Sequence, residues 1–199
     1  MSQSERGRFQ PHTDGRSRFP AMNGLHTLVA TACMCLIVVG SNVLVQYPIN
    51  RWLTWGALSY PVAFLVSDLL NRRFGPAAAR RIALSGFAAA VIISIWAATG
   101  RIALASGTAF LMAQFADIHV FDRLRHQNWW RAPLIAGVAG AVLDTFLFFG
   151  IAFAGTGIDW LSLALGDLGV KLAVNVLLLA PFRALMWNLA RPGDATRPR

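Results

Sequence analysis

Ionisable side chains occur inside otherwise apolar stretches of this 199-residue chain. In the segment SYPVAFLVSDLLNRRFG, residues 59 to 75, a carboxylate follows a long apolar run. The chain has nine acidic residues, and four of them lie within or at the ends of such runs: Asp68, Asp117, Asp144 and Asp167. Lys171 lies inside another run. A charge in a bilayer costs about 2.5–3.5 kcal/mol on insertion scales, so it normally faces a partner or a water-filled cavity.

Two explanations account for such residues. One is an ion pair or hydrogen bond between helices that serves only assembly, and the other is a cavity with a function. Four acids and a lysine in one small bundle favour the cavity. Its walls would combine carboxylates, amides and the lysine with aromatic residues, for which the candidates are Phe64, Phe146, Phe148 and Phe149. Rings stack on a flat guest while carboxylates accept hydrogen bonds from its edge, so a small, planar, polar molecule with several donors is favoured.

Motifs for catalysis or metal binding are absent from the sequence. It has no Walker A loop, no HExxH and no GxSxG. The four histidines are scattered, at positions 12, 26, 119 and 126. Cys33 and Cys35 are spaced for neither a zinc site nor a redox pair, and we interpret them as buried apolar fillers. We therefore expect a protein that is not an enzyme, with no cofactor and no metal.

The composition indicates a membrane protein. Hydrophobic residues make up 56% of the chain and charged residues 14%, against about 25% charged in soluble domains. Six apolar runs are each long enough, or nearly so, for the ~20 helical residues that cross a bilayer. They cover residues 25–47, 55–70, 82–99, 102–121, 132–154 and 160–182. The predicted fold class is all-α, a polytopic six-transmembrane-helix bundle.

Basic residues predict the orientation. The net charge is +9, but the basic residues are concentrated in alternate segments between the runs, which argues against nucleic-acid binding. Fifteen lie in the N-terminal tail, after runs two and four, and at the C-terminal end: Arg6, Arg8, Arg16, Arg18, Arg72, Arg73, Arg80, Arg81, Arg123, Arg125, Arg131, Arg183, Arg191, Arg197 and Arg199. Two, Arg51 and Arg101, lie on the other side. The positive-inside rule then puts both termini in the cytoplasm.

The domain organisation follows from the same pattern. Residues 1–22 are polar and predict a disordered, basic cytoplasmic tail. Residues 23–190 form the transmembrane domain, and residues 191–199 form a C-terminal cytoplasmic tail. A cleaved signal peptide is not expected, because no small-residue cleavage site follows the first run.

Depth along the helices predicts which polar residues meet. With a rise of 1.5 Å per residue, Asp68 and Asp117 lie roughly 20 Å from the outer ends of their helices, in the cytoplasmic half. Asp144 and Lys171 lie near the midplane, so we expect a pair between them. Asp167, Lys171 and Asn175 share a helix face at i, i+4 and i+8, so Asp167 is a competing partner for the lysine.

Further amides complete the predicted binding set. Asn42 and Gln46 share a face of the first helix, and Gln114 lies three residues before Asp117. His119 points elsewhere on its helix. The predicted substrate-binding residues are Asn42, Gln46, Asp68, Gln114, Asp117, Asp144, Asp167, Lys171 and Asn175.

Several segments resemble a known family. They are SNVLVQYPIN (41–50), TWGALSYPVAFLVSDLLNRRFGPAAARR (54–81), AQFADIHVFDRLR (113–125), WWRAP (129–133) and LDTFLFFGIAF (143–153), with a weaker match in GDLGVKLAVNVLLLAPF (166–182). This pattern resembles the queuosine precursor transporters, the YhhQ type of the vitamin-uptake-like family. All of the predicted binding residues except Asn175 fall on motifs of that family.

The resemblance implies a six-helix importer in the bacterial inner membrane. Its substrates would be 7-cyano-7-deazaguanine and 7-aminomethyl-7-deazaguanine, salvaged for queuosine in transfer RNA. A guanine-like base offers N1–H and its exocyclic amine side by side, a fork that one carboxylate can accept. The expected partners are this small molecule and membrane lipid, with no obligatory ATPase, while a homo-oligomer stays open.

Alternatives remain at this point. The chain could be the substrate-binding subunit of an energy-coupling-factor-type vitamin importer, which would need ATPase and scaffold chains. A membrane-embedded enzyme acting on a lipid-borne substrate would need a nucleophile or metal cluster that the sequence lacks. The driving force is also open, between a proton carried on a buried carboxylate and facilitated diffusion followed by metabolic trapping.

Overall fold

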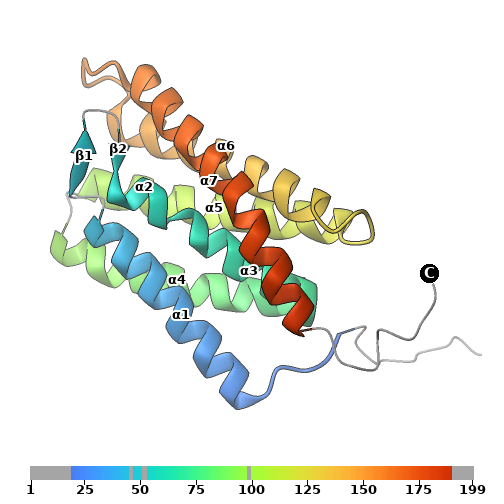
Figure 1. Cartoon of the computed structure of the whole chain (residues 1–199). Coiled ribbons are helices and arrows are strands. Elements are labelled where there is room, and N and C mark those ends of the chain that lie inside the picture. Colours follow the sequence, from blue (N-terminus) through green and yellow to red (C-terminus); the bar gives the residue numbers. More distant parts are fainter. Residues whose placement is uncertain (1–18, 45–46, 51–52, 98–99, 190–199) are drawn as a thin grey trace, which may run out of the picture.

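The computed structural model describes residues 19–44, 47–50, 53–97 and 100–189. Five long helices in this part of the chain are α1 (Gly24–Leu44), α4 (Pro76–Ala97), α5 (Gly100–Leu124), α6 (Arg131–Phe153) and α7 (Trp160–Leu189). Two shorter helices, α2 (Trp55–Ser59) and α3 (Pro61–Phe74), follow one another directly (Figure 1). Residues 1–18 of the predicted N-terminal tail, the predicted C-terminal tail and the side chains of Asn42 and Gln46 lie outside the described residues.

The helices correspond in order to the six predicted runs. Four of them, α1, α5, α6 and α7, contain segments long and apolar enough to cross a bilayer: Gly24–Ser41, Gly100–Leu124, Arg131–Phe153 and Trp160–Met186. The chain is therefore a helical membrane protein. Six crossings and cytoplasmic termini stay predictions.

The second predicted run is broken into two helices at Tyr60 and Pro61. Proline has no backbone N–H, so Pro61 cannot donate to the carbonyl one turn earlier. The Tyr60 N–H still bonds the Gly56 carbonyl at 2.9 Å, and the Ala63 N–H bonds the Tyr60 carbonyl at 3.0 Å in a tighter turn. The break therefore lies where the sequence carries Tyr-Pro, and it places the Tyr60 side chain at a helix junction.

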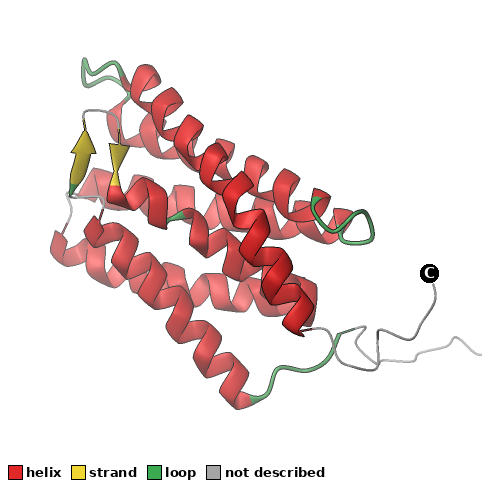
Figure 2. Cartoon of the chain, viewed as in Figure 1, coloured by secondary structure: helices red, strands yellow, loops and turns green. Residues whose placement is uncertain are grey.

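A short β-hairpin departs from the all-α prediction. Strand β1 (Pro48–Asn50) pairs antiparallel with β2 (Leu53–Thr54), with Pro48 opposite Thr54 (Figure 2). The first predicted run extended to Tyr47, whereas α1 ends at Leu44. Proline at position 48 cannot continue a helix, so the chain leaves the helical conformation before it. The hairpin fills the connection between α1 and α2.

Helix α3 lies at the centre of the bundle. It contacts each of the other described helices, and half of its residues are buried (Figure 1). Helices α5 and α6 make the most extensive helix pair. At Gly140 of α6 an added Cβ would lie 2.8 Å from the Phe64 ring and 3.4 Å from the Ala113 carbonyl, so glycine permits this close approach. Residues on α3 are thus positioned for contact with both halves of the chain.

Polar and apolar side chains are distributed as expected for a protein surrounded by lipid. Leu25, Leu28 and Leu36 of α1 are 66–73% exposed. Asp117 and Gln114 are fully buried, and Lys171 is 6% exposed. The interpretation of both cysteines as buried fillers is wrong for Cys33, which is exposed, while Cys35 is half-buried. An apolar environment accepts a thiol on the outer surface as readily as a protein interior does.

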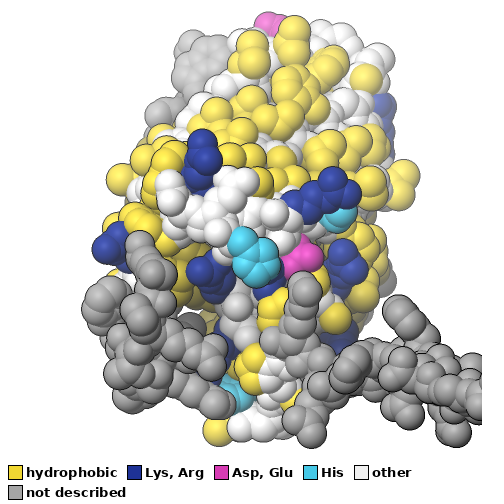
Figure 3. Space-filling model, turned by 90° about the vertical axis from the view of Figure 1, so that its right-hand side faces the viewer, with side chains coloured by type: hydrophobic (Ala, Val, Ile, Leu, Met, Phe, Trp, Pro, Cys, Tyr) yellow, Lys and Arg dark blue, Asp and Glu magenta, His cyan; other side chains and the backbone are white. Residues whose placement is uncertain are grey.

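Basic side chains gather at one end of the bundle. The start of α1, the α3–α4 junction, the α5–α6 loop and the end of α7 lie at that end, and the hairpin and the α6–α7 loop lie at the other (Figure 1). Figure 3 views the basic end, where arginine side chains lie among polar and histidine side chains below an apolar surface. Its exposed arginines include Arg80, Arg81, Arg123, Arg131 and Arg183.

Candidate functional site

A lysine between two carboxylates joins α6 and α7. The Lys171 Nζ atom lies 2.7 Å from Asp144 Oδ2 and 2.5 Å from Asp167 Oδ2. The Thr145 hydroxyl donates to Asp167 Oδ2 at 3.0 Å and lies 3.3 Å from the lysine nitrogen. The two pairings that the sequence left as alternatives therefore coexist. We call Asp144, Thr145, Asp167 and Lys171 the lysine cluster.

Tyr60 extends the lysine cluster to the centre of the bundle. Its hydroxyl donates to Asp144 Oδ1 at 3.0 Å, and the Lys171 nitrogen lies 5.6 Å from its ring centroid. The ring also packs edge-on against Phe64 at 5.9 Å and Phe110 at 6.0 Å. Sequence reasoning did not include Tyr60 or Thr145. The Tyr-Pro helix break was the available signal for Tyr60, because it fixes the tyrosine at a helix junction.

A second polar group, formed by Asp68 and Asp117, lies between α3 and α5. The two carboxyl groups are neighbours within side-chain hydrogen-bonding reach, and we call them the acid pair. Asp68 is 4% exposed and Asp117 is fully buried. Both Asp117 oxygens and Asp68 Oδ1 are buried without a hydrogen-bond partner in the described structure. Buried polar atoms are normally hydrogen-bonded, so this group is exceptional.

Gln114 is oriented beside the acid pair by Ser67. The Ser67 hydroxyl donates to Gln114 Oε1 at 2.5 Å, and both side chains are fully buried. Because the Gln114 amide oxygen accepts this bond, the Gln114 amide nitrogen points away from Ser67. This nitrogen, Nε2, has no hydrogen-bond partner in the described structure. One unused donor and three unused acceptor oxygens therefore lie in the same part of the α3–α5 contact. Ser67 was absent from the predicted site.

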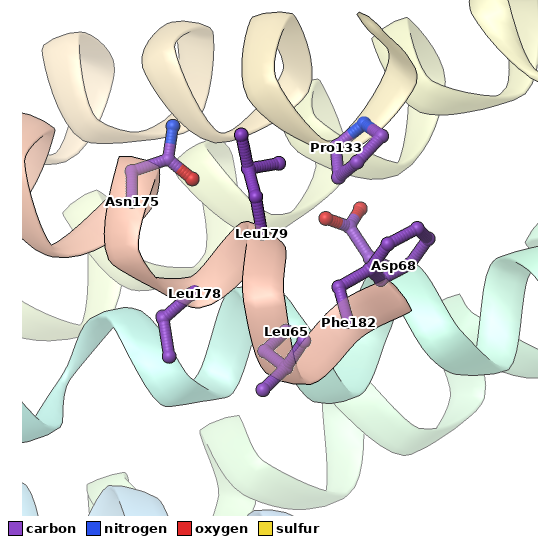
Figure 4. A pocket seen from close by; sticks show the side chains of 7 residues that line it. All are labelled: Leu65, Asp68, Pro133, Asn175, Leu178, Leu179 and Phe182. Atoms are coloured by element: carbon purple, nitrogen blue, oxygen red, sulfur yellow. The ribbon is translucent and has the colours of Figure 1, made fainter. Parts of the chain in front are cut away.

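Asp68 also borders a crevice between α3, α6 and α7. The crevice is lined by Leu65, Asp68, Pro133, Asn175, Leu178, Leu179 and Phe182, and its free space is about that of one water molecule. Figure 4 shows the Asp68 carboxylate directed toward Pro133. In the same view the Asn175 amide nitrogen points at α6, where it donates to the Leu134 carbonyl at 3.1 Å. The crevice does not hold a planar base in this conformation.

An arginine network lies on the side of the acid pair that faces the basic end of the bundle. Arg125 is 8% exposed and donates to both the backbone and side-chain oxygens of Asn71. Its Nε lies 2.7 Å from Asp122, and its guanidinium lies 4.5 Å from the Phe19 ring. The Asn71 amide in turn donates to the Ile118 carbonyl at 2.8 Å. We call Arg125, its partners Asn71, Asp122 and Phe19, and Ile118 the inner network.

The predicted site residues thus fall into two groups. No hydrogen bond or ion pair between described residues joins the lysine cluster to the acid pair. In this conformation the two groups are therefore separate and do not line the single shared cavity that the sequence predicted. Asn175 lies in the α6–α7 contact, and His119 is exposed. Of the expected aromatic lining, Phe64 is buried but Phe146 is 38% exposed. Phe148 and Phe149 pack on Phe153.

The polar groups at these positions can recognise a polar guest through hydrogen bonds. Among the described residues, no cluster of three or more His, Cys, Asp or Glu side chains could hold a metal ion. The lysine cluster is an ion-paired helix contact with its donors and acceptors engaged. The acid pair has unengaged acceptor oxygens, and Gln114 beside it has an unengaged donor. A polar guest would therefore gain most at the acid pair.

Comparisons with known proteins identify relatives. Residues 54–99 and 93–186 match the family described as "Putative vitamin uptake transporter". The chain is 35% identical, over 77% of its length and 83% of the relative's, to the protein named "Queuosine precursor transporter" of Escherichia coli (strain K12). It is 30% identical, with the same coverage, to the "Probable queuosine precursor transporter" of Haemophilus influenzae (strain ATCC 51907 / DSM 11121 / KW20 / Rd).

A third relative is more distant. The "Probable queuosine precursor transporter" of Bacillus subtilis (strain 168) is 26% identical over 75% of the chain. No solved structure gives a significant match. The family match covers well over half of the chain, and a relative above 30% identity spans most of it. The chain therefore belongs to the vitamin-uptake-transporter family, among its queuosine precursor transporters.

Proposed function

We propose that the protein imports 7-deazapurine precursors of queuosine across the bacterial inner membrane, with both termini in the cytoplasm. The substrates would be 7-cyano-7-deazaguanine and 7-aminomethyl-7-deazaguanine. The names of the relatives support the substrate class. The basic end of the bundle supports the orientation, because basic residues are retained on the cytoplasmic side. The six crossings that the sequence predicts would place both termini on that side.

The observation that carries this proposal is the set of unengaged atoms at the acid pair. The edge of a guanine-type base presents one acceptor, O6, followed by two donors, N1–H and the exocyclic amine. Gln114 Nε2 offers a donor, while Asp68 and Asp117 offer acceptor oxygens. A bound base would give these buried atoms the hydrogen-bond partners that they lack, and the bonds to the carboxylates would be charge-assisted and therefore stronger than neutral ones.

Substrate access requires a conformation more open than the one described. Asp68 borders the water-sized crevice between α3, α6 and α7. Movement of α6 and α7 relative to α3 would enlarge it next to the carboxylate. Alternating opening toward the two sides is the general behaviour of such carriers. Asn42, Gln46, Asp144, Asp167, Lys171 and Asn175 are proposed to complete the path or the pocket.

The binding prediction uses the detergent-purified full chain and the two deazaguanines, guanine and adenine. Asp68→Asn removes an acceptor and should abolish measurable binding, and Gln114→Leu should weaken it. One lost hydrogen bond with a buried partner costs about 1–3 kcal/mol, so Gln114→Leu should reduce affinity by about 5- to 150-fold. Adenine, whose edge lacks the acceptor–donor–donor order, should bind much more weakly than guanine.

Asp159→Asn is the matched control. Asp159 is exposed in the α6–α7 loop, where its carboxylate accepts from the Ser162 N–H, and asparagine caps a helix equally well. This variant should bind normally. Normal binding by both Asp68→Asn and Gln114→Leu would remove the acid pair from the substrate site.

Transport itself is measured with the purified chain in liposomes. Uptake of labelled 7-cyano-7-deazaguanine without ATP or another protein is expected. Uptake that appears only with an ATPase and a scaffold chain would instead make the protein the binding subunit of an energy-coupling importer.

A further inference from the structure

We propose that Asp68 and Asp117 form a proton-binding site that couples each substrate taken up to one proton. The proposal rests on the proposed function, because it names the driving force of that transport. It concerns the same acid pair but a different ligand, a proton.

The geometry of the pair favours a shared proton. Two carboxyl groups on different helices lie within hydrogen-bonding reach, and three of their oxygens have no other partner in the described structure. Two ionised carboxylates at this separation repel each other, and each is desolvated. One proton between them removes the repulsion and provides the missing hydrogen bond. Paired carboxyl groups in proteins commonly behave in this way.

Among the described residues, no cation on the surrounding elements is paired with Asp68 or Asp117. Lys171 of α7 is ion-paired with Asp144 and Asp167. Arg125, after α5, is engaged by Asn71 and Asp122.

The remaining arginines near this end are also directed elsewhere. Arg72 of α3 donates to the Arg125 carbonyl, and Arg73 of the same helix lies over the Phe74 ring. The other arginines at this end are exposed: Arg80, Arg81, Arg123, Arg131 and Arg183. The described part of α1 carries no acidic, lysine or arginine side chain, and its His26 packs against Phe74. Within the described structure, a proton is therefore the counter-charge available to the pair.

The two acids differ in their surroundings. Asp68 borders the crevice, whereas Asp117 is fully buried. A guest in the enlarged crevice would meet Asp68 first, and an ionised Asp68 accepts its donors best. The proton then resides on Asp117, which keeps only one negative charge in the pair. Substrate and proton are thus bound at the same time, and symport further requires that the empty pair loses its proton to the cytoplasm before it returns.

The charge balance of one cycle is simple. One proton enters the pair from the outer side, travels with the substrate and leaves to the cytoplasm. Transport of neutral 7-cyano-7-deazaguanine therefore moves one positive charge inward. An inward proton gradient should accumulate it, and the accumulation should stop when a protonophore is added.

The experiment combines binding and uptake by the full chain. Wild-type protein in weak buffer should take up a proton on binding 7-cyano-7-deazaguanine at alkaline pH. Its apparent affinity should fall about tenfold per pH unit once the pair has lost its proton. In liposomes an inward proton gradient should give an internal concentration several-fold above the external one.

Asp117→Asn tests the assignment, because its amide resembles a carboxyl group that never releases its proton. Because Asp117 is also a proposed substrate contact, this variant should bind the deazaguanine more weakly than the wild type, but its remaining binding and exchange should lack the tenfold fall in affinity per pH unit at alkaline pH. Its accumulation ratio in a proton gradient should fall to one. Asp159→Asn should accumulate substrate like the wild type.

The outcomes separate the two proposals. Wild-type protein that binds and exchanges the deazaguanine, but neither takes up protons nor responds to a proton gradient, overturns the coupling alone. Accumulation that persists in Asp117→Asn overturns it as well. Wild-type protein that binds no deazaguanine at any pH refutes the proposed function instead.

Discussion

Replacing Lys171 by methionine removes the cation that lies between Asp144 and Asp167. Methionine keeps most of the side-chain volume, so the change tests charge and not packing. The lysine side chain is 7% exposed, and those of the two acids are 9% and 17% exposed. Breaking a buried ion pair by removing one partner costs about 3–5 kcal/mol, because a buried charge is left without compensation.

The expected loss of thermal stability is large. A change of 1 kcal/mol shifts Tm by about 2–4 °C in a chain of this size, so Lys171→Met should lower Tm by roughly 6–20 °C. Adding Asp144→Asn removes one of the two stranded charges and should recover roughly half of this loss. Adding Asp167→Asn as well should recover most of the remainder. Because the three residues are in contact, the Tm change of each combined variant should differ from the sum of the changes in the single variants.

The assay is thermal unfolding of the detergent-purified variants, measured by intrinsic fluorescence. Asp159→Asn combined with Lys171→Met is the control and should recover nothing, because Asp159 is an exposed loop residue. Lys171→Met as stable as the wild type would refute the reasoning. So would a rescue by Asp159→Asn equal to that by Asp144→Asn.

Two further predictions concern helix packing and the inner network. Gly137→Ala places a methyl group against the Asn175 amide, so it should lower Tm by several degrees, and Asn175→Ala should partly restore it by making room; a double variant less stable than either single one would contradict this contact. Arg125→Gln removes the cation beside Asp122, Asn71 and Phe19 and should open the inner network. A cysteine introduced in place of Ala116, beside Asp117, should then react faster with a membrane-impermeant thiol reagent added from the cytoplasmic side. The control Arg123→Gln, on the exposed surface, should not change the reaction rate. Equal reaction rates in both variants would mean that the inner network does not close this end.

Much of the molecule could be predicted from the order of residue types. Apolar runs of membrane length predicted a helical membrane protein, and each of them corresponds to a helix or a pair of helices. The 1.5 Å rise placed Asp144 and Lys171 at equal depth, and they form an ion pair. The i and i+4 spacing placed Asp167 on the same face as Lys171, and that contact is also present. The depth of a residue along its helix and the helix face on which it lies depend only on its position in the sequence, so both can be predicted from the sequence.

Tertiary structure decided how the helices are rotated and which of them are neighbours. In lipid, apolar residues cover both the packed and the outward faces, so a uniformly apolar helix does not reveal its orientation. Phe146 could therefore be expected in the pocket and yet be 38% exposed. Only the packing of α3 against α5 brought Asp68 beside Asp117, and only the helix break at Pro61 brought Tyr60 to Asp144. The sequence determined which polar groups are buried, and the rotation and order of the helices decided which of them meet.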